Sequence, residues 1–97
     1  MANDEYDSER FPGNFYAGLI VLLDRARGRG LLRSRGGREI SFEFPFVTVV
    51  GAPLGRRFPG IELIREGDEV GFDVGWTSHG LRVTAIRPAR TSRPKES

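Results

Sequence analysis

The stretch GRGLLRSRGGREISFEF, residues 28–44, decides the fold class. Residues 39–44 alternate between apolar side chains on one face and charged or hydroxyl side chains on the other, which is the period of a half-buried strand. Gly36 and Gly37 separate this strand from residues 28–34, and paired glycines accept the positive φ of a tight hairpin turn. The stretch therefore predicts two antiparallel strands joined by a short turn.

Further strand-like segments flank this hairpin on both sides. Residues 17–24 are an apolar run that predicts a strand buried on both faces, residues 69–76 alternate again, and a last strand alternates from Leu81 until Pro88 ends it. The segment 61–68 predicts at most one short helical turn or bridge. Five short strands joined by glycine turns predict an all-β domain, a small five-stranded antiparallel barrel of the oligonucleotide-binding (OB) type.

Length and composition indicate one small domain. The chain has 97 residues, of which 38% are hydrophobic, and this suits a single compact core. We expect a flexible lead-in over 1–14, the β domain over 15–88 and a disordered basic tail over 89–97. The aromatic side chains near the ends of the predicted strands are expected to pack on the barrel rather than to stay exposed: Phe11, Phe15, Tyr16 and Trp76.

What the sequence lacks excludes several classes of site. It has no cysteine, so disulfides, cysteine-based zinc sites and thiol nucleophiles are excluded. His79 is the single histidine and is expected to be an ordinary turn residue; we predict no enzyme, no metal and no cofactor. The acidic start differs from the basic start of a signal peptide, and no apolar stretch reaches the roughly 20 residues that cross a bilayer. A cytoplasmic protein without a membrane partner is therefore expected.

Positive charge is concentrated in one segment of the chain. Six arginines fall within residues 25–38, although the net charge is only +2, and acidic groups lie on both sides of this segment. Such asymmetry hints at an anionic partner, while a hairpin kept soluble by its charges explains the charge alone equally well. Arg56, Arg57 and Phe58 form a second basic and aromatic group in the loop 51–60, which is rich in glycine and proline.

The order of these motifs resembles the cold-shock domain. Residues 27–32, RGRGLL, are similar to the Lys-Gly-Phe-Gly-Phe-Ile motif of its second strand, and residues 40–44, ISFEF, to the Val-Phe-Val-His-Phe motif of its third. Residues 63–74 are similar to its Leu-x-Glu-Gly-x-x-Val-x-Phe-x-Val segment, and residues 80–87 to its closing strand. The resemblance covers residues 16–88 and implies a five-stranded barrel that binds single-stranded RNA or DNA by stacking bases on exposed aromatics.

The residues that stack bases in that family are mostly replaced in this chain. Arg29 and Leu31 stand where the second strand carries phenylalanines, and Ser41 and Glu43 stand where the third strand carries phenylalanine and histidine. Phe44 is the member of the stacking set that is kept. The resemblance therefore implies the scaffold more strongly than the usual binding surface.

Two functions from different classes follow from these residues. In the first, an arginine-led face binds single-stranded RNA or DNA through Arg25, Arg27, Arg29, Leu31, Arg33 and Phe44, with Arg56, Arg57 and Phe58 as secondary contacts. In the second, Leu19, Val21 and Leu22 form an exposed apolar patch that holds a protein partner or a second copy in a homodimer. The first hypothesis is favoured because the resemblance implies nucleic-acid binding.

Overall fold

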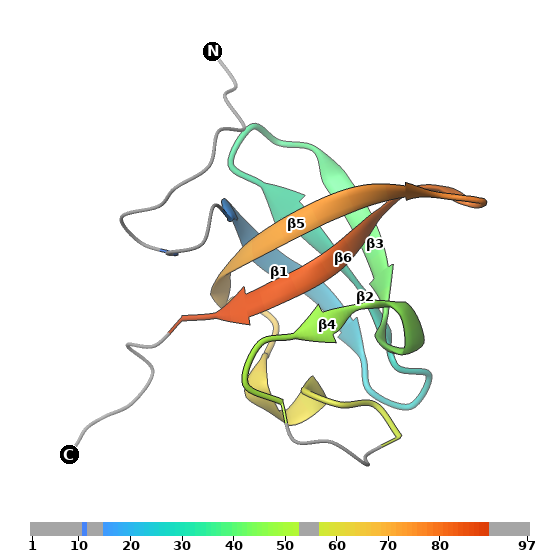
Figure 1. Ribbon diagram of the computed structural model, residues 1–97. Coiled ribbons are helices and arrows are strands. Elements are labelled where there is room, and N and C mark those ends of the chain that lie inside the picture. The colour runs from blue at the N-terminus through green and yellow to red at the C-terminus, as the bar shows by residue number, and fades with distance from the viewer. Residues whose placement is uncertain (1–10, 12–14, 53–56, 90–97) are drawn as a thin grey trace, which may run out of the picture.

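The computed structural model describes Phe11 and residues 15–52 and 57–89 of the chain. In these ranges the elements are β1 (Tyr16–Asp24), β2 (Arg29–Ser34), β3 (Glu39–Glu43), the 3-10 helix η1 (Phe44–Phe46), β4 (Thr48–Val49), the 3-10 helix η2 (Ile61–Leu63), β5 (Glu69–Thr77) and β6 (Gly80–Pro88) (Figure 1). Neither 3-10 helix, nor any other described segment, is a helix that could span a membrane. The domain is all-β, which confirms the predicted fold class at this level. Apart from Phe11 and Ala89, the predicted lead-in and tail lie outside the described residues.

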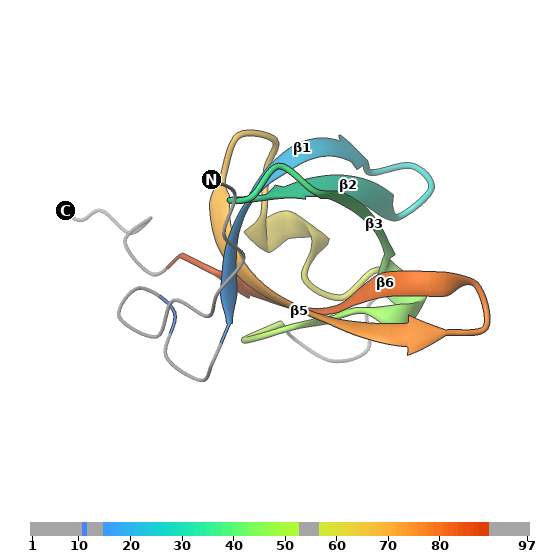
Figure 2. The ribbon, with the colours of Figure 1, turned by 90° about the horizontal axis from the view of Figure 1, so that it is seen from above.

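One sheet contains all the described strands, in the order β3-β2-β1-β5-β6-β4. β3 and β4 are the two ends of this order, yet they are separated in the chain only by residues 44–47. A connection of this length spans at most about 18 Å, so the sheet must curl until its two ends adjoin. Figure 2 shows the resulting ring of strands. The described strands form no backbone ladder between β3 and β6, so the sheet is curled but not closed.

The sequence predicts five strands, and the structure has a sixth in the described ranges. Pro45 lies in η1, where the chain turns away from β3, and β4 begins after Val47. β4 contains two residues and pairs in parallel with β6, whereas the other neighbouring strands are antiparallel. The sheet is therefore not purely antiparallel, because the chain returns to it after η1 on the far side of β6.

The hydrophobic core lies inside the curl and receives side chains from every described strand. Its buried members are Ile20, Leu32, Ile40, Phe42, Phe44, Val47, Val49, Ile64, Val70, Phe72, Val83 and Ile86. The alternation predicted over residues 39–44 is confirmed, since its apolar face is buried. Phe11 is also buried, and Tyr16 packs against the core with its ring centroid 5.5 Å from that of Phe72. The packing of Phe11 and Tyr16 agrees with the expectation that these two aromatic side chains lie against the barrel.

The first predicted strand is not buried on both faces. Leu19 is 37% exposed and Leu22 is 50% exposed. The register between β1 and β2 shifts between Ile20 and Leu22, so that Val21 forms a β-bulge. Because of the extra residue, both leucines point to the outside although they are three positions apart.

Alternating glycines at the start of β2 allow aromatic rings to approach the backbone. A Cβ on Gly30 would lie 2.5 Å from the carbonyl oxygen of Leu22 and 2.5 Å from Cζ of Phe42. Gly28 has a φ of +67°, and a Cβ there would lie 2.3 Å from Cε1 of Phe58. Both positions need a residue without a side chain, because the space is occupied by the core.

We expect the Gly30→Ala substitution to destabilise the domain by about 2 kcal/mol or more, because overpacking typically costs roughly 1–3 kcal/mol and here meets backbone as well as a ring. The thermal midpoint Tm, followed by circular dichroism, should fall by roughly 10 °C, given about 4–8 °C per kcal/mol for a domain of this size. The matched control is Gly75→Ala in β5, where a Cβ would meet only Cγ2 of Thr84, at 3.1 Å. Equal Tm values for the two variants would contradict the close packing at Gly30.

Candidate nucleic-acid interface

The outward-pointing side chains of β1, β2 and β3 form one continuous surface. Burial alternates along β2 and β3, and the register places each outward residue of β2 opposite one of β3. The Nη1 atom of Arg82 in β6 donates a hydrogen bond to Ser41 Oγ in β3 and so extends the surface across the join of the curled sheet. We call this surface the outer face; it consists of Leu19, Leu22, Arg29, Leu31, Arg33, Glu39, Ser41, Glu43 and Arg82.

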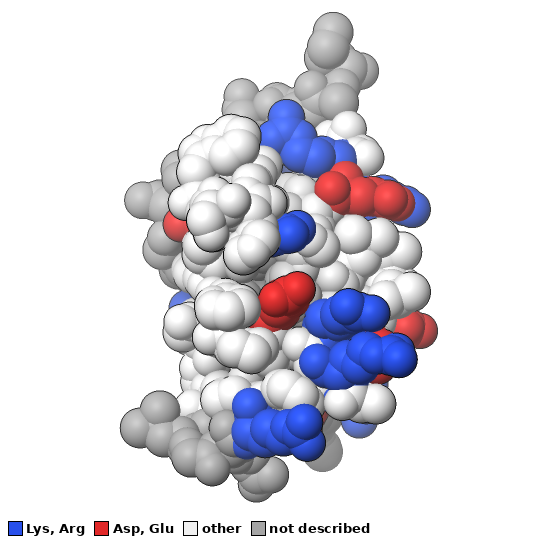
Figure 3. Space-filling view, turned by 90° about the vertical axis from the view of Figure 1, so that its right-hand side faces the viewer, with Lys and Arg blue, Asp and Glu red and all other residues white. Residues whose placement is uncertain are grey.

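On the face drawn in Figure 3, arginines gather toward one half of the view, with acidic groups between them. Most of the blue groups in Figure 3 lie in the right-hand half of the view, which is the back of the molecule as drawn in Figure 1. Strands β1, β2 and β3 lie at that back side. In the described part of the chain, the side chain of Arg29 is exposed and has no hydrogen-bond or ion-pair partner. Arg33 is paired, with its Nη2 atom 2.7 Å from Glu39 Oε2. Arg29 is thus the predicted arginine of the outer face that is most available to an anion.

Two other predicted arginines belong to the β1–β2 turn. Arg25 donates from Nη1 to the carbonyl oxygen of Ile61 at 3.0 Å and from Nη2 to that of Ile64 at 3.1 Å, and so ties the turn to η2. The side chain of Arg27 is 70% exposed and lies 3.2 Å from Asp24 Oδ2. Arg25 therefore has a structural role, whereas Arg27 remains accessible to solvent.

The pKa of Asp24 is lowered, first by the hydrogen bond from the backbone N–H of Arg27 and then by the nearby Arg27 guanidinium. A lowered pKa in the folded state means that this carboxylate stabilises the turn above its ordinary pKa of 3.8. The contribution is lost as the pH falls from that value through the lowered pKa. The turn that presents Arg27 is therefore held in place at neutral pH.

Phe44 does not occupy the exposed position that the resemblance implies, and this corrects the expectation. Its side chain is 2% exposed and lies in the core, with its ring edge-on to Phe42 at 5.8 Å between centroids. Phe58 also packs against the core, and the Arg57 guanidinium lies 5.0 Å from the centroid of its ring. Arg56 lies outside the described residues. The two predicted aromatic contacts, Phe44 and Phe58, therefore pack with the core instead of standing free on the outer face.

Two large aromatic side chains that the sequence reasoning did not place on the surface are exposed. Phe46 is 74% exposed and Trp76 is 82% exposed. Pro45 is the one signal for Phe46, because a proline at the start of η1 ends the alternation that buries Phe42 and Phe44. Trp76 shares a strand face with buried residues of β5, but the nine-residue strands β5 and β6 run beyond the core (Figure 1). The expectation that Trp76 packs on the barrel is therefore wrong.

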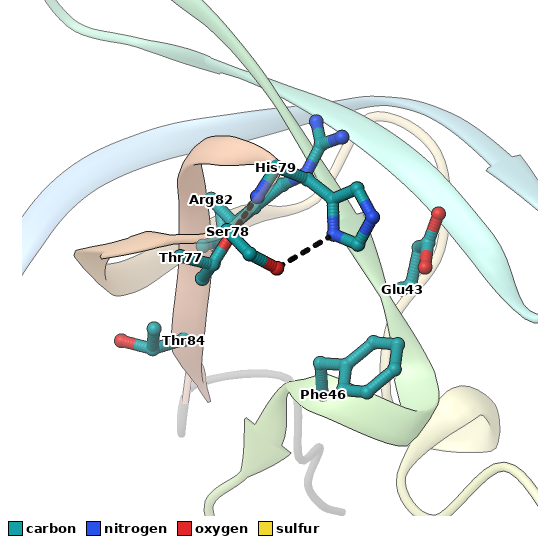
Figure 4. Close-up of a pocket in the computed structure, with 8 residues that line it drawn as sticks. Glu43, Phe46, Thr77, Ser78, His79, Arg82 and Thr84 are labelled. Carbon is teal, nitrogen blue, oxygen red and sulfur yellow. Dashed lines mark hydrogen bonds between the residues drawn. The ribbon is translucent and has the colours of Figure 1, made fainter.

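A cleft of about 250 Å³ lies between the end of β3, η1 and the β5–β6 hairpin. It is lined by Glu43, Phe46, Thr77, Ser78, His79, Arg82, Val83 and Thr84 (Figure 4). His79 is a turn residue, as expected; its backbone N–H donates to Thr77 Oγ1 at 3.0 Å and its Nδ1 lies 3.4 Å from Ser78 Oγ. The described residues contain no group of three or more His, Cys, Asp or Glu side chains that could hold a metal ion. Aromatic, hydroxyl and charged side chains thus converge in one concave place.

The different roles of the two arginines predict different effects on stability. Arg25→Ala should lower Tm by several degrees, because two backbone carbonyls of the η2 segment lose a charged donor and such hydrogen bonds are worth about 1–2 kcal/mol when partly exposed. Arg29→Ala should leave Tm unchanged within about 2 °C, since surface changes without partners stay within roughly 0.5 kcal/mol. Equal losses in differential scanning calorimetry would show that this assignment of roles is mistaken.

Comparison with protein-family models and with curated proteins finds no match for this chain. The resemblance to the cold-shock domain therefore rests on the order and spacing of its sequence motifs.

Proposed function

We propose that this protein binds single-stranded RNA or DNA on its outer face and the adjoining cleft, on an OB-type barrel similar to the cold-shock domain. The topology supports the barrel: β1, β2 and β3 follow one another as neighbours, β1 also pairs with β5, and β6 pairs with β5 and with β4. If β3 and β4 are two halves of one strand that bends at η1, five strands surround the core. The parallel pairing of β4 with β6 then lies where the barrel closes.

Accessible guanidinium groups support an anionic ligand. Among the described residues the side chain of Arg29 has no partner, and that of Arg82 has none besides Ser41. Arg27 is paired with Asp24, but exposed ion pairs are worth only about 0–1 kcal/mol, so its guanidinium can exchange the carboxylate for a phosphate. These three arginines provide phosphate contacts around the cleft end of the outer face.

The observation that carries the proposal is the exposed ring of Phe46 beside Arg82 and His79 in the cleft. Phe46 is exposed and lines a cleft together with polar and charged side chains, so its ring is available to stack on a ligand there. Bases stack on such rings with about 1–3 kcal/mol each, whatever the sequence, and arginines nearby neutralise the backbone. Stacking is thus proposed to take place at η1 and the hairpin rather than on β2 and β3.

A protein partner, or a second copy of the chain, is the alternative that a separate observation favours. Leu22 and Leu31 lie opposite each other on the outer face, Leu19 is exposed nearby, and Arg29 and Arg33 lie at the edge of this apolar patch. Apolar centres with polar rims are typical of protein interfaces. The patch lies over β1 and β2, away from Phe46, so the two functions can be tested with different substitutions.

Arg29→Glu and Phe46→Ala should each weaken the binding of a fluorescein-labelled, mixed-sequence 12-nucleotide single strand by about tenfold, through lost phosphate contact and lost stacking respectively. Fluorescence anisotropy at low salt measures the affinity. The matched control is Arg38→Glu, which makes the same charge change at the exposed β2–β3 turn, far along the hairpin from Arg29. A loss at Arg38 as large as that at Arg29 would show that only net charge matters.

Affinity for the same oligonucleotide should fall steeply with salt. For about three phosphate contacts the slope of log K against log salt is near −2, or a loss of roughly 20-fold between about 50 and 200 mM. No binding at low salt would overturn the proposed function. If the protein is then dimeric by light scattering and Leu22→Asp makes it monomeric, the apolar patch is the functional surface instead.

A further inference from the structure

The cleft beside Phe46 has the dimensions and the walls of a site for one flat ring. Its volume of about 250 Å³ is below the roughly 300–1,000 Å³ of pockets that enclose drug-sized ligands. Phe46 and His79 contribute the two aromatic rings of its lining, and Figure 4 shows both rings bordering the same space. One base of a single strand can therefore stack on Phe46 while its edge meets the polar side chains of the lining.

Glu43 is the acidic residue of the cleft lining. Its exposed carboxylate lines the cleft, and among the described residues it has no hydrogen-bond or ion-pair partner. Arg29 is opposite Glu43 in the strand register, yet no ion pair joins them, and the Arg82 guanidinium donates to Ser41. An unpaired carboxylate repels phosphates, so at this position it suits a base edge and not the backbone.

A carboxylate only accepts hydrogen bonds, and the four bases differ in the donors that they offer. The Watson–Crick edge of guanine presents two adjacent donors, N1–H and the N2 amino group, which match the two oxygens of a carboxylate. Cytosine and adenine present one amino donor next to an acceptor nitrogen. Thymine and uracil present one N–H between two carbonyl oxygens, which the carboxylate repels. Guanine is therefore the base that Glu43 fits.

We infer that the cleft takes one guanine of a single strand, stacked on Phe46 and bound at its Watson–Crick edge by Glu43. This inference rests on the proposed function and adds base selectivity to it. Arg82, on the same lining, has guanidinium donors left for the adjacent phosphate. The negative charge of Glu43, which opposes binding of the backbone, is then the source of specificity.

The test compares oligothymidylate of nine nucleotides with the same strand carrying one central dG. The chain should bind the dG strand about tenfold more tightly, since a good bidentate contact to a base discriminates by roughly 5- to 150-fold. Replacing the dG by deoxyinosine, which lacks the N2 amino group, should remove much of this preference. Uridylate strands with and without one guanosine show whether the selectivity extends to RNA.

Glu43→Gln keeps the size of the side chain and should bring the affinity ratio of the two strands close to one, because an amide offers one acceptor oxygen in place of two. Glu39→Gln is the matched control: it removes the same charge from β3, but its carboxylate is paired with Arg33, so the ratio should persist. Equal binding of both strands by the unchanged protein, or a preference that survives Glu43→Gln, overturns the guanine site and leaves the proposed function intact. Failure of both strands to bind at low salt overturns both.

Discussion

Residues 44–47 carry the chain from one end of the sheet to the other, and most of the structure depends on this short connection. Because β3 and β4 cannot lie far apart, the sheet curls and encloses the core between its own strands. The same curl brings Ser41 of β3 to Arg82 of β6 and places the end of β3 beside the β5–β6 hairpin. The cleft is thus a consequence of the topology, since its lining comes from segments that are far apart in sequence. Because Gly30 has no side chain, the ring of Phe42 packs directly against the backbone of β2, and the core inside the curled sheet is closely packed.

Local sequence patterns predicted which residues share a face of a strand. They did not predict whether a side chain is buried where this depends on how far the core extends. The alternation over 39–44 and the Gly36-Gly37 turn were sufficient for the β2–β3 hairpin, and the structure confirms both. The apolar run alone predicted a strand buried on both faces, and the exposure of Leu22 was expected only under the second hypothesis, because the bulge at Val21 that turns this side chain outward has no signature in an apolar run. Trp76 alternates correctly with buried neighbours, yet the hairpin extends beyond the core, and no period reveals where a core ends.

For the candidate site, the sequence likewise showed which residue types are present, whereas their partners and exposure followed only from the tertiary structure. Arginines near the β1–β2 turn were visible in the sequence, but only the structure distinguishes Arg25, which holds η2, from Arg29, which is free of partners among the described residues. Phe44 matched a family motif and is nevertheless buried, whereas Phe46, two residues later, is exposed after the turn at Pro45. The stacking surface is thus proposed to have moved from the strands to η1 and the hairpin. The outer face carries Leu22, Leu31 and Glu43 in place of aromatic side chains. Binding on this face therefore differs from the stacking of successive bases on aromatic residues of the strands.

Single-stranded nucleic acid is proposed to bind where β3, η1 and the β5–β6 hairpin meet. Backbone NMR of the isotope-labelled chain, titrated at low salt with the nine-nucleotide strand that carries one central dG, tests this claim residue by residue. We expect the largest shifts at Glu43, Phe46, His79 and Arg82, which line the cleft, with smaller ones at Arg29. Shifts confined to Leu19 and Leu22 on β1, or no shifts at all, would contradict it.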